Sequence, residues 1–472
     1  MLMQDKIKWF VCLTLPIAAW LAPSGFWGID GLTIVEQRVI AIFIFALLFW
    51  ILEPIPIFST SVIIIALELF VLSDRNFVLF QSAGEANFGA VMSYKEIMAT
   101  FASPIIMLFL GGFFLAMAAT KFQLDINLAR VLLKPFGKKT PSVLFGFMLI
   151  TAIFSMFMSN TATTAMMLAI LSPVLQQFEV NDKGKTAFVL GVAFAANIGG
   201  MGTPIGTPPN AIAMKYLTEE MAIGFGQWMS FGVPFALGLM VIAWLLLLRL
   251  FKPQAKEISI GISGKFRKNW QALTVYATFI VTLLFWLFDA LHGMTSYQVA
   301  MIPVAVFTAT RIITPQDLKR ISWDVLWLVA GGIALGLALD KTGLAQHIIQ
   351  SIPFDTFPAL AIVWIATVIA IVMATFMSNT ATANLLMPIM AALGTALPGI
   401  AGIGGGKMII LAVAFSSSLA MALPISTPPN AMAHATGQLD TKQMLRAGAI
   451  IGLIGLLGVH FLMMLLNYTG VL

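Results

Sequence analysis

The seven residues FMSNTAT, from Phe157 to Thr163, recur unchanged from Phe376 to Thr382. Each copy places Ser, Asn and Thr side chains inside a long apolar stretch. A polar group that faces lipid without a hydrogen-bond partner is energetically costly. The two copies therefore predict that other polar groups, or a bound solute, meet these side chains.

The composition of the whole chain is that of a membrane protein. Of its 472 residues, 60% are hydrophobic and 10% are charged, and the mean hydropathy is +0.96. Repeated apolar runs of about 17 to 25 residues match helices that cross a bilayer, whereas the alternating segments of an outer-membrane barrel are absent from the sequence. We predict an all-α polytopic membrane protein. Its net charge of +6 belongs to its loops, and no nucleic acid partner is expected.

Eleven membrane-spanning helices and two re-entrant hairpins are expected. The hairpins cover about residues 141–178 and 358–393. With the amino terminus inside and the carboxyl terminus outside, 20 of the 26 basic residues fall on the cytoplasmic side of the inner membrane, in agreement with the positive-inside rule. The spans, two of them broken (186–217 and 407–437), are 9–27, 36–52, 55–72, 101–120, 186–217, 229–249, 270–289, 297–310, 323–340, 407–437 and 445–467.

Three landmarks recur at a spacing of 219 or 220 residues. One is the FMSNTAT cluster; another is a glycine pair that begins at Gly111 and again at Gly331. The third is PIGTPPNAIA from Pro204, which returns as PISTPPNAMA from Pro424. This regularity indicates an internal duplication. An odd number of crossings separates the copies, so the second copy is inverted and the two clusters are expected to meet near the midplane.

Each interruption of a membrane helix exposes backbone groups that can bind ions. The carbonyls of the incoming half suit a small cation such as sodium, and the amides of the outgoing half suit an anion. The TPPN elements predict similar breaks, because proline lacks an amide donor. No charged side chain occurs from Pro141 to Phe178 or from Pro358 to Gly406. Helix dipoles and co-bound cations, not basic side chains, are therefore expected to balance an anion there.

The paired SNT clusters and TPPN breaks resemble the divalent anion/sodium symporter (DASS) family, which includes INDY-type bacterial dicarboxylate transporters. The resemblance covers nearly the whole chain. It implies a homodimeric elevator-type transporter. The scaffold would comprise residues 1–100, 218–320 and 438–472, and the moving transport domain residues 101–217 and 321–437.

The resemblance also implies which residues bind the transported solutes. The substrate carboxylates would contact Asn160, Thr161, Asn379 and Thr380, with Thr207 and Thr427 nearby. A first sodium ion would use Ser155, Ser159, Asn160 and the backbone at Gly206, and a second would use Ser378, Asn379 and the backbone at Ser426. The copies diverge at one point: Ala374, with Thr375 beside it, stands where the first half has Ser155.

The expected function is sodium-coupled symport of C4-dicarboxylates such as succinate, malate or fumarate, with no organic cofactor. A sodium-independent dicarboxylate exchanger is the alternative, and an anion channel is the alternative from a different class. Citrate, sulfate and phosphate remain open as cargo. No nucleophile with a paired base occurs in the spans, so an enzyme is not expected. Glu53 and Glu68 lie in or near the second and third spans, where a carboxylate is energetically costly. Each could be a proton carrier or a structural group. The position of Glu53 at a helix end favours a structural role for it.

Overall fold

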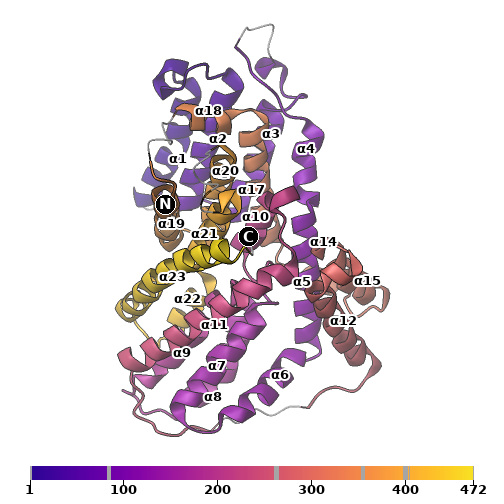
Figure 1. Cartoon of the computed structure of the whole chain (residues 1–472), viewed down its shortest axis with the longest axis vertical. Coiled ribbons are helices and arrows are strands. Elements are labelled where there is room, and N and C mark those ends of the chain that lie inside the picture. The colour runs from indigo at the N-terminus through magenta and orange to yellow at the C-terminus, as the bar shows by residue number, and fades with distance from the viewer. Residues whose placement is uncertain are drawn as a thin grey trace.

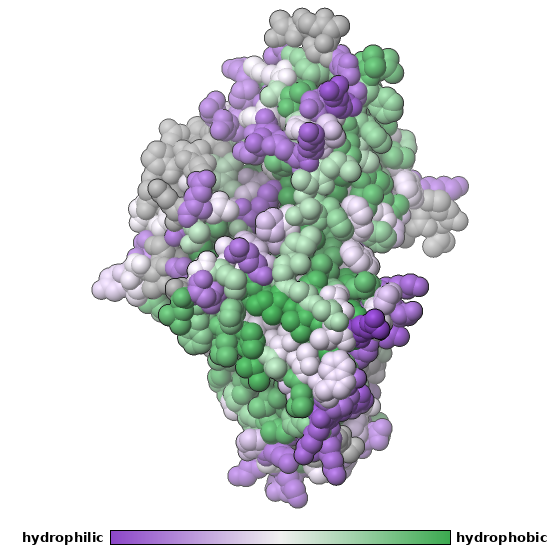
Figure 2. All heavy atoms as spheres, turned by 90° about the vertical axis from the view of Figure 1, so that its right-hand side faces the viewer, coloured by the Kyte–Doolittle hydropathy of each residue, from purple (hydrophilic) through white to green (hydrophobic). Residues whose placement is uncertain are grey.

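The computed structural model describes residues 3–81, 87–259, 265–351, 357–396, 402 and 404–470. Over these residues the chain is helical, and its extended segments form only two isolated bridges, Ser73 with Met92 and Lys139 with Glu257. The prediction of an all-α protein is confirmed. Figure 2 shows hydrophobic side chains over much of the middle of one face and hydrophilic side chains gathered at its two ends, the pattern of a protein that crosses a bilayer.

Seven helical segments are long and apolar enough to cross a membrane, and others are shorter or divided. The seven are α2 (Ile34–Leu52), α4 (Tyr94–Ala99) continued by α5 (Pro104–Lys121), α11 (Phe225–Leu250), α12 (Trp270–Leu287), α17 (Trp323–Lys341), α19 (Ala359–Phe376) and α23 (Thr441–Thr469). Three further α-helices, α20 to α22, belong to the second repeat and are described below. The other α-helices are α1 (Met3–Leu21), α3 (Ile57–Val71), α6 (Leu124–Leu133), α7 (Thr140–Ser155), α8 (Asn160–Leu175), α9 (Gly184–Gly200), α10 (Pro208–Tyr216), α13 (Asp289–His292), α14 (Ser296–Val299), α15 (Met301–Ala309), α16 (Pro315–Leu318) and α18 (Leu344–Ser351).

The second half of the chain repeats the elements of the first. Its hairpin is α19 with α20 (Asn379–Ala396), and its broken helix is α21 (Gly405–Ser418) with α22 (Pro428–Ala435). These correspond to α7 with α8 and to α9 with α10. Short 3₁₀ turns complete the chain: η1 (Ser24–Trp27), η2 (Val78–Phe80), η3 (Thr100–Ala102), η4 (Lys134–Phe136) and η5 (Glu219–Met221). The duplication seen in the sequence is therefore present in the fold.

Glycines let the repeated helices α5 and α17 approach their neighbours closely. A Cβ atom at Gly111 of α5 would lie 2.8 Å from the Cβ of Ala300, between α14 and α15. A Cβ atom at Gly331 of α17 would meet the side chain of Ser61 on α3 at less than van der Waals distance. Any larger residue would push these helix pairs apart.

The buried apolar side chains form two clusters. One cluster joins the hairpins and broken helices to α11 and α23, and the other joins α2, α3 and α12 to α5 and α17. Stacking of Trp228 on Phe415, with ring centroids 5.7 Å apart, fixes α11 against α21. The expected domain boundaries placed α5 and α17 with the hairpins and α11 and α23 with the scaffold. In the structure the buried side chains of α5 and α17 lie in the second cluster, together with Ala211 of α10 and Ala381 and Leu385 of α20, and most of those of α11 and α23 lie in the first. The domain boundaries remain a prediction.

The first hairpin and α9, the first half of its broken helix, lie at one end of the molecule, and α10 lies nearer the middle (Figure 1). There α7, α8, α9 and α11 run beside one another, and α9 packs against α7, α8 and α11. Helices α2, α18 and α20 lie toward the other end in the same view. The SNT cluster at the start of α8 and its copy at the start of α20 both line a single cavity between these regions.

Candidate functional site

The two repeats enclose a cavity of about 660 Å³. It is lined by ten of the sequence-predicted site residues: Ser159, Asn160, Thr161, Gly206, Thr207, Ser378, Asn379, Thr380, Ser426 and Thr427. Ser155, the remaining predicted residue, lies buried behind them and donates a hydrogen bond to Asn160 Oδ1 over 2.6 Å. The structure thus brings together residues more than 200 positions apart in the sequence.

Four of the helices that begin at the wall of this cavity belong to the hairpins and broken helices. They are α8, α10, α20 and α22, whose first residues are Asn160, Pro208, Asn379 and Pro428. The N-terminus of a helix carries unpaired amides and the positive end of the helix dipole. Of the described residues that line the cavity, Asp324 is the one with a charged side chain. An anion inside would be met by backbone amides and helix dipoles.

The serine of each SNT cluster caps the helix that follows it. Ser159 Oγ accepts a hydrogen bond from the amide of Ala162 over 3.1 Å, and Ser378 Oγ accepts one from the amide of Ala381 over 3.1 Å. An N-terminal cap of this kind satisfies one of the amides that a helix leaves without an internal partner. Each serine therefore caps the helix that follows it, and the other amides of that first turn have no partner within the helix.

The asparagine of each TPPN element holds the unwound backbone that precedes it. Asn210 Nδ2 donates to the carbonyls of Gly200 and Thr203, and Asn430 Nδ2 donates to those of Met421 and Leu423. The two prolines of each element occupy the first positions of α10 and α22, where no intrahelical amide is needed. The TPPN sequence therefore starts a helix and also anchors the end of the helix before it.

Two oxygen atoms of the first repeat lie close to the point that a Cβ atom of Gly200 would occupy. A Cβ atom at this glycine would lie 2.8 Å from Asn160 Oδ1 and 2.9 Å from the carbonyl oxygen of Gly206. A side chain would fill the space between these oxygens, and glycine leaves it open. Side-chain and backbone oxygens that converge on one point are the ligands that hard cations prefer.

The second repeat differs at the corresponding place. Asn379 Oδ1 is buried and has no hydrogen-bond partner within the described part of the chain. Ala374 carries no hydroxyl, and Thr375 Oγ1 donates to the carbonyl of Ile371 in its own helix over 2.7 Å. Ser426 Oγ is also engaged, because it donates to the carbonyl of Thr375 over 2.8 Å. The threonine beside Ala374 does not replace Ser155.

Asn197 is a residue of this site that sequence reasoning missed. It lies on α9, lines the cavity, and donates from Nδ2 to Thr427 Oγ1 and to Asn430 Oδ1, both over 3.1 Å. These bonds join the broken helix of the first repeat to that of the second. The available signal was an amide residue within the apolar stretch AFAANIGG, three residues before Gly200.

The two carboxylates singled out in the sequence, Glu53 and Glu68, lie in different surroundings. Glu53 ends α2 in the left-handed conformation, with φ 47°, and its amide donates to the carbonyl of Phe49. This position supports the structural interpretation of Glu53. Glu68 is completely buried on α3, and it lies outside the residues that line the cavity.

Residues 4–469 match the sequence model of a family described as the sodium:sulfate symporter transmembrane region. The chain belongs to the divalent anion/sodium symporter family. The sodium-dependent dicarboxylate transporter SdcS of Staphylococcus saprophyticus is 29% identical over 465 residues, which cover 90% of this chain and 85% of that protein. SdcS of Staphylococcus aureus strain USA300 is 30% identical over 456 residues, covering 88% of this chain and 83% of that protein.

Two solved transporter structures share the fold of this family member. The YdaH transporter of Alcanivorax borkumensis has a TM-score of 0.56 at 13% identity and matches 88% of this chain and 98% of its own. MtrF of Neisseria gonorrhoeae has a TM-score of 0.52 at 12% identity, and the match covers 86% of this chain and 94% of MtrF. At these identities the likeness concerns the fold alone. The family assignment makes the protein a multi-pass membrane transporter and not an enzyme.

Proposed function

We propose that the protein is a sodium-coupled symporter of C4-dicarboxylates such as succinate, malate or fumarate. One observation carries the proposal: the N-termini of α8, α10, α20 and α22 lie together at a cavity whose described lining has no basic side chain. Such a cavity attracts an anion through amides and dipoles, and it needs a mobile cation to balance the remaining charge. The relatives named as sodium-dependent dicarboxylate transporters favour a dicarboxylate over sulfate, phosphate or citrate.

In this proposal the two SNT clusters bind the two ends of the substrate. Asn160 and Thr161 contact one carboxylate, and Asn379 and Thr380 contact the other, while Thr207 and Thr427 lie beside them. Amide and hydroxyl donors hold a carboxylate without a fixed positive charge. Release is then easier than from a buried ion pair, because a bound sodium ion leaves with its anion.

The cations would bind behind the SNT clusters. The first sodium ion would use Asn160 Oδ1 and the carbonyl of Gly206, with Ser155 and Ser159 as further ligands; their oxygens and the open point at Gly200 fit a small hard cation. The second would use the free Oδ1 of Asn379 with Ser378 and the backbone at Ser426. Because Ala374 offers no hydroxyl, the second site would bind sodium more weakly.

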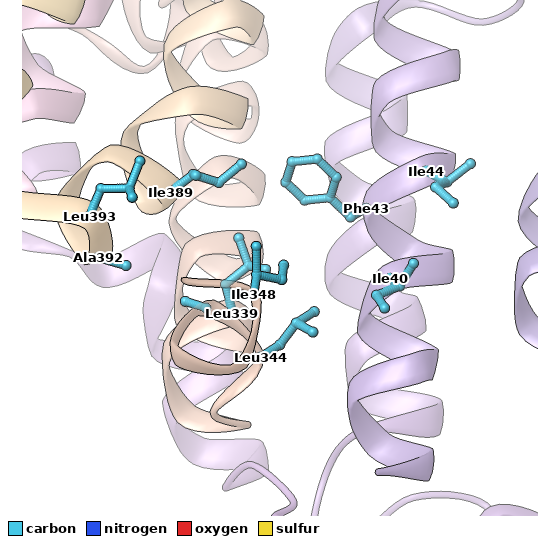
Figure 3. A pocket seen from close by; sticks show the side chains of 10 residues that line it. Ile40, Phe43, Ile44, Leu339, Leu344, Ile348, Ile389, Ala392 and Leu393 are labelled. Carbon is cyan, nitrogen blue, oxygen red and sulfur yellow. The ribbon is translucent and has the colours of Figure 1, made fainter. Parts of the chain in front are cut away.

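Transport would proceed by an elevator movement of one packed body against the other. The two apolar cores support a moving body built from α7–α11 and α19–α23, and a scaffold built from α1–α5 and α12–α18. Between them, Phe43 of α2 and Ile389 of α20 face each other across an apolar cavity of about 130 Å³ (Figure 3). The described lining of this small cavity is apolar, so sliding would break no polar contact at this point.

The proposed movement begins from an inward-facing state. Beyond the site residues, the large cavity is lined by Pro56, Ile57 and Phe58 at the start of α3 and by Ser322 and Asp324 at the start of α17. Both helix starts lie on the cytoplasmic side if the amino terminus is inside and eleven spans follow. A homodimer, held together through the scaffold, completes the proposal.

The test is uptake of radiolabelled succinate into proteoliposomes that contain the purified protein. We expect concentrative uptake that requires an inward sodium gradient and does not require internal dicarboxylate. Uptake that ignores sodium but depends on internal dicarboxylate would replace symport by exchange. Dissipative flux that never exceeds the external concentration would indicate a channel.

A further inference from the structure

Two side chains of the proposed moving body donate hydrogen bonds to the backbone of α17, which belongs to the proposed scaffold. Asn384 of α20, which is completely buried, donates from Nδ2 to the carbonyl of Leu328 over 3.0 Å. Lys215 of α10 donates from Nζ to the carbonyl of Ile333 over 2.8 Å. Helix α17 itself packs closely against α3. The two hydrogen bonds therefore join one proposed body to the other.

Two glycines of α17 make room for these donors. Gly332 and Gly336 are four residues apart, so they lie on the same face of the helix. A Cβ atom at Gly332 would overlap the side-chain amide of Asn384. A Cβ atom at Gly336 would lie 3.1 Å from Lys215 Nζ and 3.2 Å from Pro388 Cγ of α20. A side chain at either glycine would push the moving body away from α17.

The other repeat has no donor at the equivalent positions. At the spacings of 219 and 220 residues that relate the repeats, Asn384 corresponds to Ala165 of α8, and Lys215 corresponds to Ala435 of α22. Both alanines are exposed in this structure. An alanine side chain donates no hydrogen bond, so neither can replace its counterpart.

Helix α5, the counterpart of α17, also offers less room. Gly332 corresponds to Gly112, but Gly336 corresponds to Ala116. One methyl group therefore stands on α5 where α17 leaves a space.

These differences matter because the repeats are expected to be inverted. In such a transporter the opposite-facing state exchanges the roles of the two repeats, so that α8 and α22 would pack against α5 as α20 and α10 pack against α17 here. We propose that Asn384 and Lys215, received by the glycines of α17, form a lock that favours the state seen here over the opposite one. The transporter without cargo therefore rests in this state, the proposed inward-facing one. This inference rests on the proposed elevator movement.

The experiment measures how often the cavity opens to the outside. A single cysteine is placed in the cavity by Ala162→Cys, in a protein whose one native cysteine is removed by Cys12→Ala. A membrane-impermeant maleimide is added outside right-side-out membrane vesicles, without sodium or succinate. The reagent reaches the new cysteine in outward-facing molecules, so the rate of labelling reports the population of that state. Labelling after denaturation gives the total amount of protein.

Three substitutions in this parent protein release the lock, each by giving one repeat the residue of the other. They are Asn384→Ala, Lys215→Ala and Gly336→Ala. Loss of a hydrogen bond of ordinary strength changes the ratio of two states about fivefold. We therefore expect each variant to be labelled from outside about five times faster than the parent.

Two matched controls change a lysine and a glycine outside the lock. Lys341 lies at the end of α17 and faces Glu96 of α4 at 3.7 Å, within the proposed scaffold. A Cβ atom at Gly238 of α11 meets nothing within 4 Å. Lys341→Ala and Gly238→Ala are therefore expected to be labelled at the rate of the parent.

Labelling of the folded lock variants at or below the rate of the controls would overturn the inference. If one of the three variants fails to fold, the other two decide. A parent protein that the external reagent never labels would refute the elevator movement on which the lock depends. Absence of sodium-driven succinate uptake by the wild type would instead refute the proposed function. The labelling needs neither solute, so the two failures are distinguishable.

Discussion

Asn197 donates a hydrogen bond to Thr427 Oγ1 over 3.1 Å and so joins the broken helix of the first repeat to that of the second. The same amide group donates to Asn430 Oδ1. The two unwound segments are therefore positioned relative to each other by a side chain that lines the cavity. The geometry of the proposed anion site depends on both repeats at once.

Replacement of Asn197 by alanine is expected to weaken both transport and stability. The change leaves Asn430 Oδ1 buried without its donor, at a cost of about 1–3 kcal/mol. The matched control is Ser417→Ala, at the equivalent position of α21, because the Ser417 hydroxyl donates to the carbonyl of Val413 within its own helix. Thermal unfolding in detergent and succinate uptake measure the two effects. Equal losses in the two variants would contradict a specific role for the link between repeats.

Gly200→Ala is expected to abolish or greatly reduce sodium dependence. Its methyl group would stand 2.8 Å from Asn160 Oδ1 and 2.9 Å from the carbonyl oxygen of Gly206, in the space assigned to the first sodium ion. Gly238→Ala on α11 is the control, because a Cβ atom at Gly238 meets nothing within 4 Å. The sodium concentration for half-maximal uptake is the measurement. A value for Gly200→Ala equal to that of the control would refute the assignment of the first site.

Removal of the hydroxyl at Ser155 and addition of a hydroxyl at Ala374 are expected to change the sodium affinity in opposite directions. Ser155→Ala removes the hydrogen bond to Asn160, worth about 1 kcal/mol, so the half-maximal sodium concentration should rise about fivefold. Ala374→Ser supplies the hydroxyl that the second repeat lacks at the position equivalent to Ser155, and that concentration should fall. An unchanged sodium response in both variants would show that these positions lie outside the ion sites.

The contact between Lys121 and Asp317 is expected to make stability depend on acid pH. Partial burial by itself raises the pKa of the Asp317 carboxyl, but hydrogen bonds from Lys121 and Thr314 outweigh this effect and lower the pKa below its ordinary value. The contact therefore stabilises the folded protein above the pKa of the unfolded carboxyl, about 3.9, and this contribution is lost as the pH falls through the folded-state pKa.

Asp317→Asn is accordingly expected to unfold more easily than the wild type at neutral pH, by about 1 kcal/mol, with the difference shrinking in acid. Thermal unfolding of both proteins across the acid range provides the measurement. A difference that stays constant as the pH falls would show that charge is not its source.

Much of this architecture follows from the duplicated sequence. The hairpins, the breaks before Pro208 and Pro428 and the capping serines were predictable, because polar and proline residues inside apolar helices have few structural solutions. The pairing of Asn197 with Thr427 was not predictable, since it depends on how two distant helices meet in space. Long apolar helices carry no polar face that reveals their neighbours. Their grouping into two cores follows from local fits such as Gly331 against Ser61.

Equilibrium binding of radiolabelled succinate to the purified protein tests most directly whether the two SNT clusters form one site. The account predicts saturable binding in sodium buffer, no binding when choline replaces sodium, and loss of binding in both Asn160→Ala and Asn379→Ala although each variant remains folded. Full binding by either variant in sodium would contradict a site shared between the two repeats.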